Sequence, residues 1–487
     1  MAKPTDDVEL SPTDLGLARF VEAHLAIVLR TKPNPQDCER AVQILLAAYP
    51  MLAMRMDFWR TKFCSCDYPQ KIYHSRTVKK DLNQVLPCRT AEVGSPPVQL
   101  IDTQLLADCL NFNRDTWGEI CGEPVLRITA VTFNDAWAVR FIISHTLGDI
   151  RALHWIVESF FVLLSGREVP AVSPIRSNLA FNPEYIDGWK ALSTSGTTHP
   201  VAKDHQHDMV AGWFRTISSG VQQRLWSAYD AYSPRRQVHR SLFIPQCIVD
   251  HWVQKAQEAG VRVTEHDLLM GFIYEATYQA LSTTPHFSFF IGFQQHLQSP
   301  SPLGNTWFLI PIPDLYKSKS KASPSTPSTS KNHSSSTLLP ALFLHAQLIR
   351  HTITQCRHPA CFPEIHEQHR QLGTTPWRPG HFGTRTPHLK ISCWTKQPWY
   401  DLDCAGENPV FTDMELRFYR LFDLLGVHGA NDFVGTIKCT GSGNETLAGG
   451  QEGYWVAGQL AEITWTTMFN MLTTFSTTTA TEPSARA

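Results

Sequence analysis

Apolar residues follow strand-like and helix-like patterns along the chain, and these patterns predict its elements. Residues 124–144 hold two runs of β-branched and aromatic residues on either side of Asn134-Asp135, which predicts a hairpin or two adjacent strands. After a short polar turn, apolar residues recur every three or four positions from Leu153 to Leu164, and Gly166 follows them. The predicted order is therefore strand, turn, amphipathic helix.

The beginning of the chain is less regular. Residues 14–30 mix helical and strand-like spacing, whereas residues 36–48 predict a helix that ends before Pro50. The apolar stripe of this helix is formed by Ala41, Val42, Ile44, Leu45 and Leu46.

The second half of the chain repeats the mixture of strands and helices. Residues 241–249, 287–293 and 307–312 are predicted strands. Thr264, with Asp267 three residues later, predicts the start of a helix that carries an apolar run. Both halves thus mix helices and strands, which predicts an α/β fold in two linked lobes.

Changes in composition suggest where these lobes begin and end. We expect an N-terminal lobe over residues 1–184, a crossover linker over 185–238 and a C-terminal lobe over 239–474. Within the second lobe, residues 317–337 are a Ser/Thr/Pro/Lys tract, which predicts a mobile low-complexity loop. Residues 475–487 are predicted to be a disordered tail.

Composition excludes several classes of protein. The chain has 487 residues, of which 43% are hydrophobic and 18% charged, as in folded globular proteins. Its net charge of −1 provides no general attraction for nucleic acid, so any anion must be bound locally. No apolar run is long enough to span a membrane, and the polar N-terminus does not resemble a signal peptide, so we expect a cytoplasmic protein. The 12 irregularly spaced cysteines predict neither a disulfide framework nor a metal site.

The strongest candidate for chemistry is His145, which follows a predicted apolar strand directly and precedes a helix. Asp149 lies four residues later, where a carboxylate can fix the turn. Histidine titrates near neutral pH and therefore suits a general base that removes a proton from a hydroxyl or an amine. The same short pattern is also common around a histidine that is merely hydrogen-bonded in a loop, and this alternative stays open.

The surroundings of His145 resemble the H-x-x-x-D-G signature of the chloramphenicol-acetyltransferase-like superfamily. Its members include the condensation domains of peptide synthetases and the BAHD acyltransferases. Four further stretches resemble this family in the expected order: residues 10–16 (LSPTDLG), residues 263–277 (VTEHDLLMGFIYEAT), Gly304-Asn305, and residues 392–411 (SCWTKQPWYDLDCAGENPVF). In the last stretch, Trp394, Tyr400, Asp403 and Pro409 match the offsets of the BAHD pattern S-W…P-x-Y-x-x-D-F-G-W-G-K-P.

This resemblance implies two chloramphenicol-acetyltransferase-like lobes with a channel between them. It implies that His145 is the general base and that Ser392 and Trp394 lie near the developing oxyanion. Asp149, Asp403 and Asn305 would have structural roles. A core aromatic without a catalytic role remains an alternative for Trp394.

The function implied by the resemblance is acyl transfer from acyl-CoA, the co-substrate, with no permanently bound cofactor and no metal. The acyl group would be acetyl, and the acceptor would be a hydroxyl of a small apolar natural product such as a terpenoid or polyketide. The transfer would be direct, without a covalent intermediate, in a monomeric enzyme. The two alternatives are a condensation-type enzyme that takes its acyl group from a carrier protein, and a non-catalytic binding protein.

Departures from the family pattern indicate a divergent branch, such as one in fungal secondary metabolism. Ser144 replaces the first histidine of the double-His form, and Ile150 replaces the glycine after the aspartate. If that position needs a positive φ, a β-branched residue would be strained there. Only Asp403 remains of D-F-G-W-G, and Gln294 or Gln295 stands where an arginine partner for the motif aspartate is expected.

Overall fold

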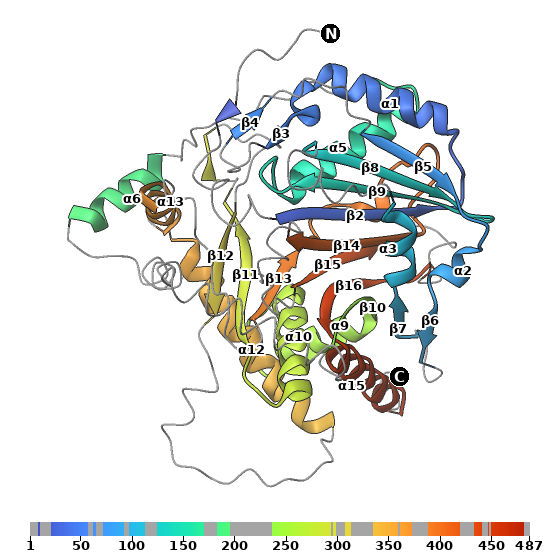
Figure 1. Cartoon of the computed structure of the whole chain (residues 1–487). Helices are drawn as coiled ribbons and strands as arrows, with labels where there is room; N and C mark the ends of the chain where they lie inside the picture. Colours follow the sequence, from blue (N-terminus) through green and yellow to red (C-terminus); the bar gives the residue numbers. More distant parts are fainter. Residues whose placement is uncertain are drawn as a thin grey trace.

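The computed structural model describes residues 8–9, 21–56, 62–64, 72–91, 97–112, 124–169, 183–194, 236–293, 296–298, 307–312, 335–358, 361–372, 388–418, 433–440, 447 and 450–481. Within these residues the chain builds two large β-sheets with helices packed against them (Figure 1). A small sheet joins β1 (Val8–Glu9), β4 (Lys62–Cys64) and β3 (Arg55–Met56). The prediction of an α/β fold is confirmed.

The first large sheet has five strands in the order β14-β2-β9-β8-β5. Strands β8 and β9 pair antiparallel on either side of Asn134-Asp135, so the predicted hairpin is confirmed. Strand β5 pairs parallel to β8, and the other neighbours pair antiparallel. The strands are β14 (Phe411–Phe418), β2 (Val21–Leu29), β9 (Trp137–Ser144), β8 (Leu126–Thr132) and β5 (Tyr73–Thr77).

Two helices, α1 (Pro35–Ala48) and α5 (Ile150–Leu164), contact each other and lie beside this sheet at the top of Figure 1. Both were predicted, and α5 buries the expected apolar face, including Leu153, Ile156 and Phe160. In α1 the predicted stripe was partly wrong, because Ile44 is 46% exposed. The buried positions centre on Cys38, Val42 and Leu45, and Ile44 points about 100° away from Leu45.

The second large sheet has eight strands in the order β12-β11-β13-β15-β16-β10-β7-β6. Strand β13 pairs parallel with both β11 and β15, and the remaining neighbours are antiparallel. The strands are β12 (Trp307–Ile312), β11 (His286–Gly292), β13 (His388–Cys393), β15 (Phe433–Thr440), β16 (Glu452–Ala461), β10 (Gln237–Pro245), β7 (Gln99–Asp102) and β6 (Cys88–Thr90).

Helices α9, α10, α12 and α15 gather below this sheet in Figure 1. The predicted cap of α10 is confirmed, since Thr264 and Asp267 form a reciprocal capping box at its start. The helices of the lower half are α9 (Gln246–Glu258), α10 (Glu265–Leu281), α12 (Ser335–Cys356) and α15 (Glu462–Thr481), with α13 (Cys361–Leu372) and α6 (Pro183–Thr194) at one end. Shorter helices are η2 (Pro50–Ala53), α2 (Leu82–Val85), α3 (Gln104–Leu110) and η4 (Trp399–Asp401).

The two lobes exchange strands. Strand β14 belongs to the second half of the chain but completes the five-stranded sheet, where it pairs with β2. Conversely, β6 and β7 belong to the first half and extend the eight-stranded sheet next to β10. Because β14 also contacts β15 and β16, it lies where the two sheets meet. Each lobe is therefore completed by the half of the chain that forms the other.

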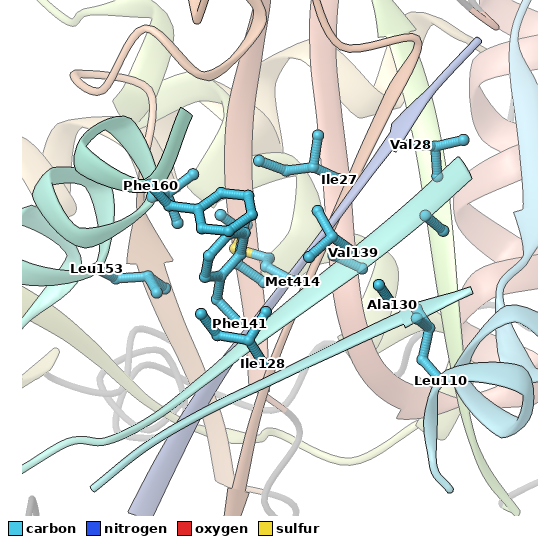
Figure 2. Close-up of a cluster of buried hydrophobic side chains, with 14 of the residues drawn as sticks. Ile27, Val28, Leu110, Ile128, Ala130, Val139, Phe141, Leu153, Phe160 and Met414 are labelled. Carbon is cyan, nitrogen blue, oxygen red and sulfur yellow. The ribbon is translucent and has the colours of Figure 1, made fainter. Parts of the chain in front are cut away.

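Each sheet has its own apolar core. Figure 2 shows part of the upper core, in which Met414 of β14 lies among side chains of β2, β8, β9 and α5. Phe141 and Phe160 pack edge to face there, with ring centroids 5.3 Å apart. The exchanged strand thus contributes buried area to the core of the lobe that it joins.

Several predicted boundaries differ from the observed elements. Helix α6 (Pro183–Thr194) crosses the predicted boundary between the N-terminal lobe and the linker over residues 185–238, where the sequence pattern was poor in periodicity. Helix α15 continues to Thr481 and buries Phe475, past the position at which a disordered tail was predicted. Most of the predicted mobile loop over 317–337 lies outside the described residues, which resume with Ser335 at the start of α12.

Candidate active site

His145 lies directly after β9, in a turn that is tightly held on both sides. Its backbone N–H donates to the Val21 carbonyl of the neighbouring strand β2, at 2.8 Å. The hydroxyls of Ser144 and Thr146 are 2.6 Å apart, and Thr146 is fully buried. The imidazole is 8% exposed. Short backbone and side-chain hydrogen bonds therefore fix the histidine directly after the end of the central strand of the sheet.

Asp149 ends this turn and caps the helix that follows. Its carboxylate accepts a hydrogen bond from the backbone N–H of Arg151 at 2.9 Å, and its backbone is extended. Ile150 is the first residue of α5. Among the described residues, the non-glycine positions with positive φ are Ser282 and Ala405, so Ile150 is not strained by its β-branch.

Ser392 and Trp394 come from the other lobe, at the end of β13. The backbone of Trp394 is held by β15, since its N–H donates to the Thr436 carbonyl at 2.9 Å. Its indole N–H donates to the Ser392 hydroxyl oxygen, also at 2.9 Å. The Ser392 hydroxyl keeps its own proton for another acceptor. Trp394 is 3% exposed and packs near Trp399, with ring centroids 6.1 Å apart.

His145, Ser392 and Trp394 line one cavity of about 470 Å³, together with Asp149. Ala23 and Leu416 of the five-stranded sheet and Phe289 and Ile291 of the eight-stranded sheet also line it. The cavity therefore lies between the two lobes, and the structure brings together four of the six residues that the resemblance assigned.

Solved structures with the same arrangement of elements identify the fold. TRI101 from F. sporotrichioides, crystallised with coenzyme A and T-2, matches with a TM-score of 0.56 and 12% identity over 95% of this chain and 97% of that chain. Vinorine synthase matches with a TM-score of 0.56 and 10% identity over 95% of this chain and 92% of that chain. This chain has the BAHD acyltransferase fold. The fold predicted from the motifs is thereby confirmed.

Comparison of sequences gives a weaker similarity to proteins of the same kind. The acetyltransferase adrJ from Penicillium roqueforti is 26% identical over 204 residues, which are 38% of this chain and 36% of that protein. The matched part thus spans about a third of the relative's length. No protein-family model matches the chain.

Of the two remaining residues that the resemblance assigned, Asp403 is described by the structure, and it does not line the cavity. Asp403 lies in the turn after η4, where its carboxylate binds Arg167 at 2.8 Å and accepts from the Gly406 N–H at 2.8 Å. Its side chain is 55% exposed, so it joins the C-terminal half to the end of α5 at the surface. Asn305 lies outside the described residues, as do the two glutamines at the place of the family's arginine.

The structure also brings a cysteine and a histidine together in the cavity that the motif analysis did not single out. Cys393 lies between Ser392 and Trp394, and His266 lies in the first turn of α10. Burial raises the pKa of the Cys393 thiol. The charge of His266 and hydrogen bonds from His266 and Thr395 lower it by more than burial raises it, so that the pKa is about 6. Both residues lie in stretches that carry the BAHD resemblance. A thiol in one stretch and an imidazole in the other were the features of the sequence that could have indicated this pair.

Basic side chains were also missed by sequence reasoning. Arg151, Arg350, Arg357 and Lys396 line the cavity, and among the described lining residues Asp149 is the one with a carboxylate. Arg350 is bound to Asp267 at 2.7 Å. The cavity wall is therefore locally positive, although the chain as a whole carries a net charge of −1. Within the described part of the chain, no helix combines the length and the apolar character needed to cross a bilayer.

Proposed function

We propose that this protein transfers an acyl group from acyl-CoA to a hydroxyl of a small apolar molecule. The observation that carries this proposal is the shared cavity. It holds a histidine fixed by one lobe and a serine hydroxyl fixed by the other, as acyl transfer requires a base and a hydrogen-bond donor for the oxyanion.

The positive wall supports an anionic donor such as acyl-CoA. Arg151 belongs to α5, Arg357 directly follows α12, and Lys396 lies in the turn after β13, so three separate elements contribute cations to the cavity wall. Phosphate groups bind guanidinium and ammonium groups through charge-assisted hydrogen bonds. TRI101, which shares the fold, was crystallised with coenzyme A.

In the proposed mechanism, His145 removes the proton of the acceptor hydroxyl as its oxygen attacks the thioester carbonyl. The carbonyl oxygen becomes an oxyanion, to which the Ser392 hydroxyl donates its free proton. The indole of Trp394 donates to the same serine and so orients it. His145 then returns the proton to the departing CoA thiolate. Along this route the acyl group passes directly to the acceptor.

Asp149 acts indirectly in this proposal. By capping α5 with its carboxylate, it fixes the end of the turn that begins at His145. Asp403 is farther away and stabilises the surface contact with Arg167. Neither carboxylate takes part in proton transfer.

The apolar part of the cavity wall supports an apolar acceptor. Aliphatic and aromatic residues that contribute to it include Phe289, Phe290, Ile291, Ile353, Phe362 and Leu416. Such a wall favours a compact, largely hydrocarbon molecule with a hydroxyl, such as a terpenoid or polyketide alcohol. We infer that the acyl group is acetyl, because the sequence relative adrJ is named an acetyltransferase.

Thiol release from acetyl-CoA, measured with a panel of hydroxylated terpenoids and polyketides, tests this function. We expect His145→Ala to reduce the acceptor-dependent rate by roughly 10²-fold or more, because it removes the base. The matched control is His286→Ala, which removes an exposed histidine on β11 that does not line the cavity. Equal rates for wild type and His145→Ala would contradict the proposed role of this histidine.

A further inference from the structure

The cavity contains a second possible nucleophile besides the acceptor hydroxyl. Cys393 is the last residue of β13, and its neighbours in sequence are the proposed oxyanion donor Ser392 and its partner Trp394. His266 approaches from the first turn of α10, and both side chains line the cavity. Successive side chains of a strand point to opposite faces, so the sulfur lies on the face of β13 opposite to the Ser392 hydroxyl, toward α10, while both residues line the same cavity.

The surroundings of Cys393 favour a thiolate. His266 provides a positive charge and a hydrogen bond to the sulfur, and the Thr395 hydroxyl lies 2.9 Å from it. Burial is the largest single influence on the pKa of His266 and lowers it, but the charges of Cys393 and Asp267 and the hydrogen bond with Cys393 together raise that pKa above its ordinary value. The positive end of the α10 dipole, where His266 stands, favours a negative charge on a nearby sulfur, although it disfavours a charge on the imidazole itself. A cysteine beside a histidine at a helix N-terminus is the arrangement that activates thiol nucleophiles.

Other cysteines of the described chain lack this arrangement. Cys88 and Cys247 are exposed, and burial of their sulfur raises their pKa. Cys38 and Cys404 are buried in apolar surroundings and their pKa is raised as well. At these four cysteines burial raises the pKa, whereas at Cys393 the neighbouring groups lower it.

We propose that Cys393 is a second acyl acceptor, which takes the acyl group from bound acyl-CoA when no alcohol occupies the cavity. The inference rests on the proposed function, because it requires acyl-CoA to bind there. The Cys393 sulfur attacks the thioester carbonyl carbon and forms a new carbon–sulfur bond. The bond to the CoA sulfur breaks, and the departing thiolate takes a proton from the His266 imidazolium. One thioester replaces another, so no oxidant or metal is consumed.

The magnitude of the thiolate effect shows where the selectivity comes from. At pH 7 a thiol with a pKa of about 6 is about ninety times more ionised than one with the ordinary value of 9.0. Its intrinsic nucleophilicity is lower by about twentyfold, because reactivity falls with basicity. The net gain is only about fourfold. Position beside the thioester must therefore contribute most of the selectivity for Cys393.

The test is mass spectrometry of the intact protein after incubation with excess acetyl-CoA and no acceptor. We expect one added acetyl group, located on Cys393 by peptide mapping and released by neutral hydroxylamine as a thioester. Cys393→Ser should abolish the hydroxylamine-sensitive adduct, and His266→Gln should slow its formation by at least about fourfold. His145→Ala should still form it, and so should Cys247→Ser, the control at an exposed cysteine.

Two further measurements separate this inference from the proposed function. If the protein binds coenzyme A and acylates an alcohol, but no thioester forms on Cys393, the inference is wrong and the proposed function stands. If Cys393 is acylated but no alcohol accepts the group, the inference stands and the proposed alcohol transfer is wrong. If coenzyme A does not bind in calorimetry and no adduct forms, both are overturned.

Discussion

Two polar clusters lie where the lobes meet: one lines the cavity described above, and the other is buried. The first, called the open cluster below, consists of His145 from one lobe and Ser392 from the other, which both line the cavity. The second is closed: Asp413 of β14 binds His239 Nε2 of β10 at 2.9 Å and accepts from the Ser241 hydroxyl of β10 at 2.9 Å. Each cluster connects the five-stranded sheet with the eight-stranded sheet.

The closed cluster holds serine, histidine and aspartate, the residue types of a hydrolytic triad, but in the wrong order. In a triad the histidine stands between serine and carboxylate. Here the carboxylate stands in the middle, so the Ser241 proton is donated to Asp413 and not to His239. All three residues are at most 5% exposed. The comparison teaches that access and hydrogen-bond order, more than residue type, distinguish a candidate base from a structural histidine.

The largest expected effect is on the closed cluster. Asp413→Ala removes the acceptor that two buried donors share, so we expect the free energy of unfolding to fall by about 3–5 kcal/mol. Denaturant unfolding followed by fluorescence measures this. Asp413→Asn is the matched control, and it should cost less because an amide oxygen can still accept one hydrogen bond. Unchanged stability in Asp413→Ala would remove the contrast between the clusters.

Substitutions in the open cluster should lower the catalytic rate and leave the stability of the fold nearly unchanged. We expect Ser392→Ala to lower kcat by roughly 10²-fold, since one oxyanion donor is lost, while the thermal midpoint changes little. Trp394→Phe should reduce kcat by less, about tenfold, because it removes only the hydrogen bond that orients Ser392. If Trp394→Phe were as damaging as Ser392→Ala, the indole would itself be the donor.

Features that depend on residues close together in the sequence could be predicted, whereas contacts between distant segments mostly could not. The hairpin around Asn134-Asp135, helix α5 and the cap at Thr264 depend on neighbouring residues, and each was predicted. The placement of His145 after a strand was predicted for the same reason. The family motifs also predicted that Ser392 lies near His145, although the two residues are far apart in the sequence, and both line the cavity.

Contacts made only by the tertiary fold were not predictable from local pattern. Strand β14 joins the other sheet because it pairs with β2. The alternation of apolar and polar residues within each strand does not show which strand will be its partner. Likewise, His266 meets Cys393 because the start of α10 lies under the end of β13. The pair between Asp413 and His239 arises in the same way at the contact of the two sheets.

The positive wall offers a smaller test of the open cluster. We expect Arg357→Ala to raise the KM for acetyl-CoA by about tenfold and to leave kcat nearly unchanged, because a phosphate contact is lost before and after the chemical step alike. Steady-state kinetics at varied acetyl-CoA measure this split. A loss confined to kcat would place Arg357 at the reacting atoms instead.

The smallest expected effect concerns the pH dependence of Cys393. Its pKa is lowered to about 6, so the reactive thiolate is present above pH 6 and is lost as the pH falls through that value. The groups that face the sulfur are His266 from α10, Thr395 from the following turn and Tyr454 from β16. We expect alkylation by iodoacetamide to have its midpoint near pH 6 at Cys393, and to be about fourfold faster at pH 7 than at an ordinary thiol.

Cys247 supplies the internal reference in the same digest, because its pKa is raised by burial and its alkylation should still increase above pH 9. His266→Gln should move the Cys393 midpoint upward, toward that of Cys247, since burial then acts on the thiol without the opposing charge. A Cys393 midpoint that stays near pH 6 in His266→Gln would mean that another group stabilises the thiolate. In that case the open cluster would contain a single working histidine, His145, and the proton for the departing CoA thiolate would have to come from elsewhere.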